Sequence, residues 1–150
     1  MQNTLVLLKP DSVQRGLVGE LITRIERRGL KLTAMKLVSV TGEQAARLYA
    51  EHVDRPFYSS LTGYITSSPL VAMVVEGDEA VRVVRSLMGD TRPLDAAPGT
   101  VRGDYATSVS FNLIHGSDSP DSAAREVGIF FADEEILSYD RDIDRWIIGS

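Results

Sequence analysis

The sequence predicts a single-domain α/β fold, an α+β sandwich of the ferredoxin-like βαββαβ type with helices on the faces of a four-stranded antiparallel sheet. Short apolar runs typical of strands alternate along the chain with segments whose apolar residues recur at helical spacing. The predicted order is β-α-β, a pair of helices and then β-α-β-α, and the chain shows neither a sequence repeat nor a linker. A length of 150 residues suits one domain, so residues 1–150 are assigned to a single unit.

The first third of the chain predicts a strand, a helix and a second strand. Residues 3–9 form a short apolar run, as in a buried strand. Apolar side chains at helical spacing follow over residues 18–25. Residues 30–40 alternate apolar and polar side chains, which predicts a strand, and a phase slip at Ala34-Met35 indicates a bulge.

The middle of the chain predicts two short helices, a strand and a third helix. Thr41 and Gln44 match a capping box, which marks a helix start. A second helix is expected to open at Pro56, with one stripe made of Phe57, Leu61, Tyr64 and Ile65. A buried strand over residues 70–75 and a helix over residues 79–88 complete this part.

Residues 89–107 show no periodicity and contain two prolines and three glycines, so a long loop is predicted there. A strand over residues 109–115 follows. Ser119 and Pro120 then suit the N-cap and first position of a last helix. Its inner face is expected to consist of Ala123, Ala124, Val127 and Phe130 or Phe131. The aperiodic tail, residues 136–150, is expected to pack along the surface or against a partner.

Composition and charge limit the classes of function. No apolar run approaches the roughly 18 residues of a membrane span, so no membrane association is expected. The short apolar N-terminal run lacks a basic segment before it, which predicts a strand instead of a signal peptide and, by default, a cytoplasmic protein. A net charge of −5 disfavours stable nucleic-acid binding. The absence of cysteine excludes disulfides and thiolate nucleophiles.

His115, in the stretch NLIHGSDS, is the first candidate for chemistry. A histidine at a strand end is most often bonded to a neighbouring loop, and metal-ligand spacing with the second histidine, His52, is absent. The helix predicted to begin near residue 120 would direct its free N–H groups towards an anion beside the ring. A carboxylate such as Glu126 could fix the tautomer and leave the other ring nitrogen free to attack, although an exposed Glu126 is equally compatible with the pattern.

Phosphoryl transfer needs several fixed cations, because its charge spreads over three oxygens. Lys9, Arg85 and Arg102 come from three different segments and could converge. Ordinary solvated charge explains Lys9 and Arg102 equally well, and a last-turn cation such as Arg85 also complements a helix dipole. Phe57 is a candidate for base stacking, with a core position as the alternative.

The stretch from Asn112 to Asp118 reads NLIHGSD and matches the pattern N-[LIV]-[IV]-H-G-S-D. Around it stand LLKPDSVQRGLVGE, RPFYSSLTGYITSSP, AMVVEG and PGTVRGDYA. With these motifs in this order and spacing, the chain resembles the nucleoside diphosphate kinases over essentially its whole length. The resemblance implies transfer of the γ-phosphoryl group from a nucleoside triphosphate to a nucleoside diphosphate, by a ping-pong mechanism through a phosphohistidine.

The resemblance also implies the site residues. His115 would be the nucleophile, supported by Glu126 and Ser117. Ribose and phosphates would be lined by Lys9, Tyr49, Arg85, Thr91, Arg102 and Asn112, of which Lys9 and Asn112 meet the ribose hydroxyls and Arg85, Thr91 and Arg102 the phosphates. Phe57 and Leu61 would clamp the base. Mg²⁺ is implied as the cofactor, bound mainly through the nucleotide phosphates, with no metal ligand from the protein.

The implied partners are nucleoside di- and triphosphates, and the implied assembly is a homo-hexamer, with a homotetramer as the alternative. The tail DRDIDRWIIGS departs from the usual family ending, which bears on subunit contacts. Two rival functions share the fold: a nucleotide-binding module without catalysis, and a phosphohistidine carrier that serves another protein. The complete set of nucleotide-lining residues argues against both.

Overall fold

The computed structural model describes residues 1–149, so Ser150, the end of the predicted tail, lies outside the described residues. Its centre is a four-stranded sheet in the order β2-β3-β1-β4, and every neighbouring pair runs antiparallel. The strands are β1 (Gln2–Leu8), β2 (Lys31–Val38), β3 (Leu70–Gly77) and β4 (Ile114–Gly116). The predicted fold class is confirmed.

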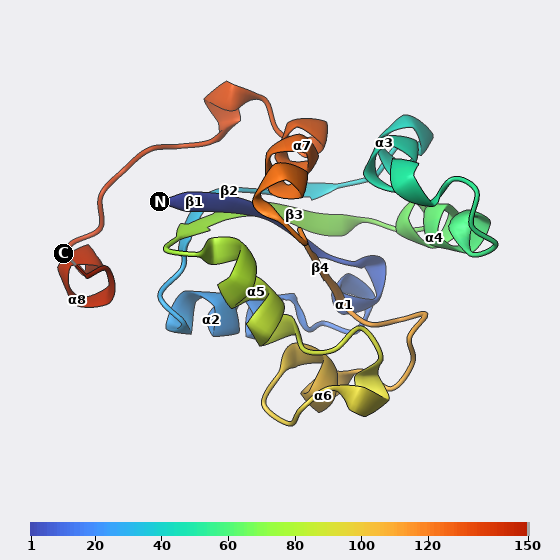
Figure 1. Cartoon of the computed structure of the whole chain (residues 1–150), viewed down its shortest axis with the longest axis horizontal. Helices are drawn as coiled ribbons and strands as arrows, with labels where there is room; N and C mark the ends of the chain where they lie inside the picture. Colours follow the sequence, from blue (N-terminus) through green and yellow to red (C-terminus); the bar gives the residue numbers. More distant parts are fainter. Residues whose placement is uncertain (150) are drawn as a thin grey trace.

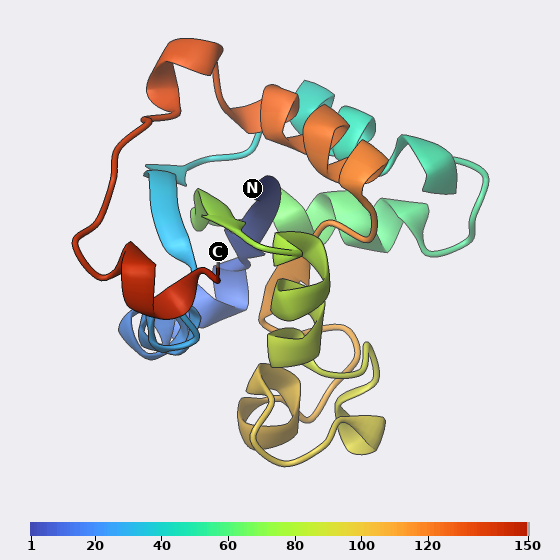
Figure 2. The same cartoon turned by 60° about the vertical axis from the view of Figure 1, so that its left-hand side comes forward.

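Helices cover both faces of the sheet (Figure 1). One face carries α3, α4 and α7, and the other carries α1, α2 and α5, with α6 beyond them. Figure 2 shows the same two layers from a second direction. The helices are α1 (Pro10–Gln14), α2 (Val18–Arg27), α3 (Gly42–Leu48), α4 (Tyr58–Ile65), α5 (Ala80–Met88), α6 (Val101–Tyr105), α7 (Pro120–Phe130) and α8 (Asp144–Ile147), and the 3₁₀ turns are η1 (Ala50–His52), η2 (Pro93–Asp95) and η3 (Asp133–Glu135).

The two layers follow from the alternation of side chains along β1. Leu5 and Leu7 point into the core under α3, α4 and α7, while Val6 and Leu8 point into the core under α2 and α5. All four side chains are fully buried, so the second half of β1 is a continuous hydrophobic run.

Several local predictions are confirmed. The register of β2 shifts between Leu32 and Ala34, which places the bulge next to the predicted phase slip. The capping box of α3 is present: Gln44 N donates to Thr41 Oγ1 at 3.1 Å, and Thr41 N donates to the Gln44 side chain at 3.0 Å. Ser119 caps α7 by accepting from Ser122 N at 3.1 Å. These signals are local, so the sequence alone carries them.

The prediction of an unbroken loop over residues 89–107 is wrong. That segment contains the 3₁₀ turn η2 and the helix α6, which begins where Thr100 Oγ1 accepts from Gly103 N at 3.0 Å. A helix of five residues is too short to show a hydrophobic period, which is why the sequence did not reveal it. The helix α1, also five residues, was missed for the same reason.

The predicted strand over residues 109–115 is also wrong in its bounds. Its alternation of apolar residues is typical of a strand, but β4 starts only at Ile114. Leu113 adopts a positive φ of 75°, which interrupts an extended strand. Before it, Ser108 and Phe111 form a single isolated bridge.

Two predicted helix faces need correction. α4 begins at Tyr58, and Phe57 at its N-cap is 46% exposed, so the proposed stripe does not reach the core at that end. On α7, Ala124 is exposed. Glu126, which the sequence left open as an exposed residue, is only 5% exposed. A buried carboxylate needs polar partners, and these lie at the candidate site.

The tail packs along the surface at the edge strand β2, which is one of the two placements expected for it. Leu137 N donates to Thr33 O of β2 at 2.9 Å, and Lys31 reaches Tyr139 O. The tail then leads into α8 (Figures 1 and 2). Trp146 in this helix is 78% exposed. Within the described residues, no helix combines the length and apolarity needed to cross a membrane.

Candidate active site

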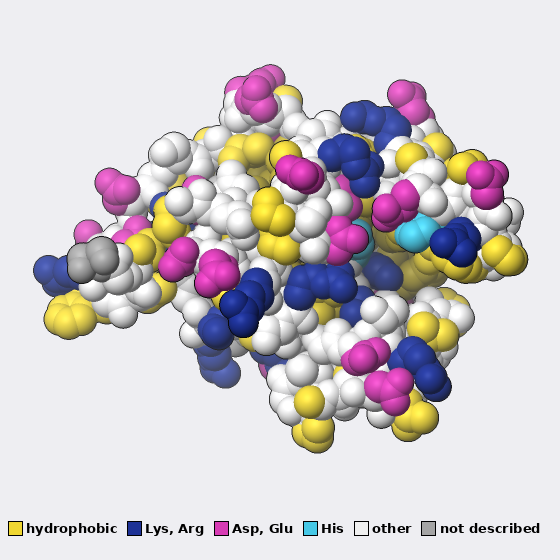
Figure 3. Space-filling model, viewed as in Figure 1, with side chains coloured by type: hydrophobic (Ala, Val, Ile, Leu, Met, Phe, Trp, Pro, Cys, Tyr) yellow, Lys and Arg dark blue, Asp and Glu magenta, His cyan; other side chains and the backbone are white. Residues whose placement is uncertain are grey.

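A cavity of about 710 Å³ opens between η1 and α4 on one side and α5 with the segment after it on the other. On the face seen in Figure 3, Lys and Arg side chains gather beside a histidine in the hollowed region. Of the site residues predicted from the sequence, all except Ser117 line the cavity: Lys9, Tyr49, Phe57, Leu61, Arg85, Thr91, Arg102, Asn112, His115 and Glu126. Side chains from segments far apart in the sequence therefore converge on one space.

His115 sits in the middle of β4, opposite Leu7 of β1, and its side chain is 20% exposed. Its Nε2 lies 2.7 Å from Glu126 Oε1, and Ser117 Oγ donates to the same oxygen at 2.9 Å. An ionised carboxylate only accepts hydrogen bonds, so the proton of the neutral ring resides on Nε2. The lone pair of the ring is then on Nδ1. Ser117 is fully buried behind the ring, which explains its absence from the cavity wall.

Glu126 is held in its ionised form. Burial alone would raise the pKa of its carboxyl, but hydrogen bonds from His115 and Ser117 and the nearby Arg125 guanidinium outweigh burial and leave the pKa below its ordinary value. Arg125 lies 3.6 Å from the other oxygen. The sequence allowed an exposed Glu126, and the structure instead places it on the buried side of α7, in contact with the histidine.

Lys9 and Asn112 meet at the end of β1. Lys9 Nζ donates to Asn112 Oδ1 at 2.9 Å, and Asn112 Nδ2 donates to Thr91 O at 3.1 Å. Burial, together with the charge of Arg102, lowers the pKa of Lys9 to about 8. An anionic ligand would stabilise the protonated form of such a lysine, because its negative charge offsets the cost of burying the ammonium group.

Arg102 is almost completely buried, with 4% exposure. Its Nε, Nη1 and Nη2 donate to the carbonyl oxygens of Asn112 at 3.2 Å, Gly89 at 3.1 Å and Ile114 at 2.7 Å. Burial and the neighbouring Arg85 lower its pKa to about 10. The guanidinium has five N–H donors, so it can clamp these backbone groups and still present donors to the cavity.

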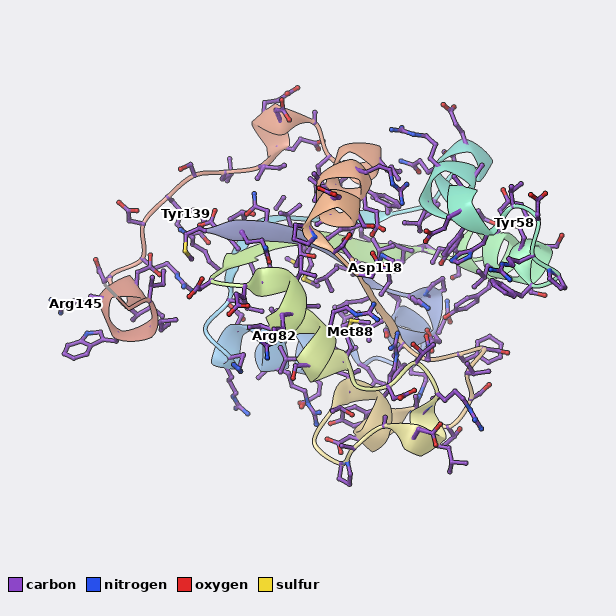
Figure 4. The ribbon with its side chains drawn as sticks, viewed as in Figure 1. Tyr58, Arg82, Met88, Asp118, Tyr139 and Arg145 are labelled. Atoms are coloured by element: carbon purple, nitrogen blue, oxygen red, sulfur yellow. The ribbon has the colours of Figure 1, made fainter. Side chains whose placement is uncertain are left out.

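Arg85 completes the cationic wall from the last turn of α5. It is exposed, and its Nη1 donates to Gly116 O at 3.3 Å, next to His115 in the chain. Asp118, labelled in Figure 4, follows where β4 leads into α7, and hydrogen bonding by Ser122 keeps its pKa below the ordinary value. Three cations, Lys9, Arg85 and Arg102, therefore line the cavity and can bind an anion, beside the carboxylates of Glu51, Asp118 and Glu126.

The opposite end of the cavity is apolar and aromatic. Phe57 stands half-exposed at the rim, with its ring 5.4 Å from the ring of His52, and Leu61 follows one turn into α4. Tyr49 is buried, and burial, with the Glu126 charge, raises its pKa to about 12. Its hydroxyl therefore remains a hydrogen-bond donor at neutral pH.

Sequence reasoning missed several residues of the cavity wall. They include Val109 and Phe111, which are 56% and 54% exposed, together with His52, Tyr64 and Asp118. Val109, Phe111 and Leu113 alternate along the chain within the segment predicted as a strand. Val109 and Phe111 stand just before the histidine motif, and this position was the one signal that they could line the cavity.

Among residues 1–149, no group of three or more His, Asp or Glu side chains lies close enough to hold a metal ion. Lys9, Arg85 and Arg102 face the cavity and suit phosphate oxygens, and the carboxylates that also line it, Glu51, Asp118 and Glu126, do not form a metal-binding group. A metal would fit this site only if the phosphates of a nucleotide supplied most of its ligands.

The chain is similar to known proteins over nearly its whole length. The family model for "Nucleoside diphosphate kinase" matches residues 2–136. A nucleoside diphosphate kinase of Listeria monocytogenes is 54% identical over 98% of this chain and 100% of its own length. One from Archaeoglobus fulgidus is 54% identical over 98% of this chain and 97% of its own length.

Solved structures agree with the sequence comparisons. A nucleoside diphosphate kinase from Halobacterium salinarum, in complex with CDP, superimposes with a TM-score of 0.96 at 49% identity over 99% of both chains. A nucleoside diphosphate kinase family protein from Babesia bovis gives a TM-score of 0.95 at 41% identity over 98% of this chain and 99% of its own. On these findings, the chain belongs to the nucleoside diphosphate kinases, a family of phosphotransferase enzymes.

Proposed function

We propose that His115 carries the phosphoryl group in the nucleoside diphosphate kinase reaction, with Nδ1 as the attacking atom. The observation that supports this most directly is the 2.7 Å contact between His115 Nε2 and the buried carboxylate of Glu126, in a cavity that Lys9, Arg85 and Arg102 also line. This contact reserves Nε2 for the proton and leaves the Nδ1 lone pair for phosphorus.

In the first half-reaction, the Nδ1 lone pair forms a bond to the γ-phosphorus of the triphosphate. The bond from that phosphorus to the bridging oxygen breaks, and its electron pair leaves on the nucleoside diphosphate. The ring becomes cationic, with its proton still on Nε2, and the Glu126 carboxylate stabilises that charge across the hydrogen bond. The second half-reaction reverses these steps with a different nucleoside diphosphate.

The cations supply electrostatic stabilisation. Arg85, Arg102 and Thr91 are proposed to contact the phosphates, and Lys9 with Asn112 to contact the ribose hydroxyls. Phosphoryl transfer spreads charge over three oxygens, so donors fixed before the reaction lower its barrier without reorganisation. The carbonyl clamp on Arg102 fixes such a donor.

Phe57 and Leu61 are proposed to clamp the base. A half-exposed aromatic ring at the rim can stack on any base, because every base offers a π-face. Tyr49 is proposed to keep its hydroxyl protonated beside the histidine and to donate a hydrogen bond to the phosphoryl oxygens. One clamp for all bases suits an enzyme that passes phosphate between different nucleotides.

Mg²⁺ is the proposed cofactor. When bound, it neutralises phosphate charge and fixes the geometry of the polyphosphate. The nucleotide phosphates would supply most of its ligands, since no group of three or more acidic or histidine side chains among residues 1–149 could hold the ion.

The assembly, the location and the extent of the domain remain predictions. We expect one domain over residues 1–150, a homo-hexamer with a homotetramer as the alternative, and a cytoplasmic protein. The exposed apolar residues Met35, Leu37 and Trp146 support association between copies. Light scattering of the full chain separates six copies from four, and cell fractionation tests the location.

The chemistry is tested by incubating the full chain with [γ-³²P]ATP. The expected result is an acid-labile label on the protein that GDP or dTDP removes. His115→Ala should abolish the label, while Asp140→Asn, which alters an exposed carboxylate in the tail, should leave it unchanged. Nucleotide binding without any label would contradict the proposal and favour a binding module, and label that only a second protein removes would favour a carrier.

A further inference from the structure

The backbone immediately before the catalytic strand is strained. Leu113 has a φ of +75°, a region that a residue with a Cβ rarely enters. Ile114 N donates to Asn112 O at 2.9 Å across it, which closes a three-residue γ-turn. Such strain persists only where the surroundings over-determine the conformation. The turn lies between Asn112, which faces the cavity, and His115.

The surroundings hold the turn by its backbone groups. Leu113 O accepts from Lys9 N at 2.9 Å and from Ser12 Oγ at 2.6 Å. Arg102 donates to the carbonyl oxygens on either side of Leu113, those of Asn112 and Ile114. The amide of Leu113 is the remaining central group, and it donates to Asp11 Oδ2 at 3.1 Å.

Asp11 has both carboxylate oxygens in use. Oδ2 holds the Leu113 amide, and Oδ1 accepts from the hydroxyl of Tyr64 on α4. The Asp11 amide donates back to the Tyr64 oxygen at 3.1 Å, and burial together with Asp11 raises the pKa of that phenol, so it remains a donor. Among residues 1–149, Asp11 lines no part of the cavity, whereas Tyr64, Asn112 and His115 do.

We propose that Asp11 is a positioning residue: it holds the strained turn at Leu113 and thereby sets the orientation of Asn112 and His115 towards the nucleotide. The inference rests on the proposed role of His115. A carboxylate in the first turn of a helix often only stabilises that helix. Here, however, one oxygen of Asp11 accepts from the Leu113 amide and the other from the Tyr64 hydroxyl. Without Asp11, the Leu113 amide loses its acceptor and the turn loses one of its restraints.

The test is single-turnover labelling with [γ-³²P]ATP by Asp11→Ala and Asp11→Asn, each as the full chain. Small misplacements of a reacting group cost up to about 100-fold in rate, so we expect Asp11→Ala to label about 10- to 100-fold more slowly. Asparagine keeps one carbonyl oxygen for the Leu113 amide, so Asp11→Asn should recover most of the rate. A purely structural role would lower the amount of label and leave the rate constant of the labelled fraction unchanged, whereas positioning lowers that rate constant at full label. Asp140→Asn is the matched control.

A second pair of variants tests the strain itself. Glycine adopts positive φ without steric cost, and alanine does not. Leu113→Gly and Leu113→Ala remove nearly the same buried side chain, so the cavity they create is shared. The rate loss caused by Asp11→Ala should be several-fold smaller in the Leu113→Gly background than in the Leu113→Ala background. If the loss is equal in both, Asp11 does not act through the turn.

The two proposals fail separately. If His115→Ala still takes the label, the proposed function is wrong. If His115→Ala is unlabelled but Asp11→Ala labels fully at the wild-type rate, the role of Asp11 is wrong and the function stands. Should the Leu113 variants not fold, the rate constants of Asp11→Ala and Asp11→Asn still decide.

Discussion

Replacing Glu126 by glutamine tests the coupling between the buried carboxylate and the catalytic ring. Glutamine has nearly the same volume and keeps one carbonyl oxygen as an acceptor, but it carries no charge. Glu126 is 5% exposed, so little solvent screens its interaction with the ring. A hydrogen bond to a charged group contributes about 1.5–3 kcal/mol, and the ring becomes cationic only as the phosphoryl group arrives. The loss therefore falls mainly on the transition state.

The expected size follows from that figure. At about 1.4 kcal/mol for each factor of ten, phosphorylation of His115 should slow by roughly 10- to 150-fold in Glu126→Gln. Rapid-quench labelling with [γ-³²P]ATP measures this rate directly. Ser117→Ala is the matched comparison, because it removes only the neutral 2.9 Å bond to the same oxygen and should cost less. A Glu126→Gln protein that labels at the wild-type rate would refute the assigned role.

The remaining predictions concern the base, Lys9 and Gly116. Phe57→Ala should raise KM by roughly 5- to 100-fold with a small change in kcat, because stacking contributes about 1–3 kcal/mol per base; an unchanged KM in steady-state assays would contradict the clamp. The pKa of Lys9 is lowered to about 8 from an ordinary 10.5, so the unfolded chain binds more protons in that window and stability should rise with pH across it. A phosphate ligand favours charged Lys9, so nucleotide binding at pH 9 should take up protons, seen by calorimetry in two buffers, and Lys9→Met should abolish the uptake. A Cβ at Gly116 would lie 2.6 Å from Met88 Sδ, so Gly116→Ala should lose about 1–3 kcal/mol of unfolding free energy in urea. Gly128→Ala, with open space at its helical position, is the control and should not lose stability.

The sequence by itself determined the fold class and most of the site membership. The bulge in β2, the capping box at Thr41 and the Ser119 cap depend on residues close together in the chain, so their signals are local. The motif around His115 identified the family before any geometry was known. The residue types that can bind phosphate were also visible in the sequence, because phosphate binding requires cationic and hydrogen-bond-donating side chains.

Tertiary structure alone decided where the strand before His115 breaks. The alternation of Val109, Phe111 and Leu113 favours a strand, but contacts with residues about a hundred positions earlier hold Leu113 at positive φ. Local propensity contains no trace of such restraints, because they come from distant segments of the chain.

The electrostatics of the site were likewise decided only by the fold. From the sequence, Glu126 could equally be exposed, and Arg102 could be an ordinary solvated charge. The structure buries both, Glu126 against His115 and Arg102 against the carbonyls of three residues. Burial changes what these groups do, because removal from water strengthens each remaining hydrogen bond and shifts each pKa. The sequence motifs identify the candidate site residues, but only the tertiary structure brings these residues together in one cavity.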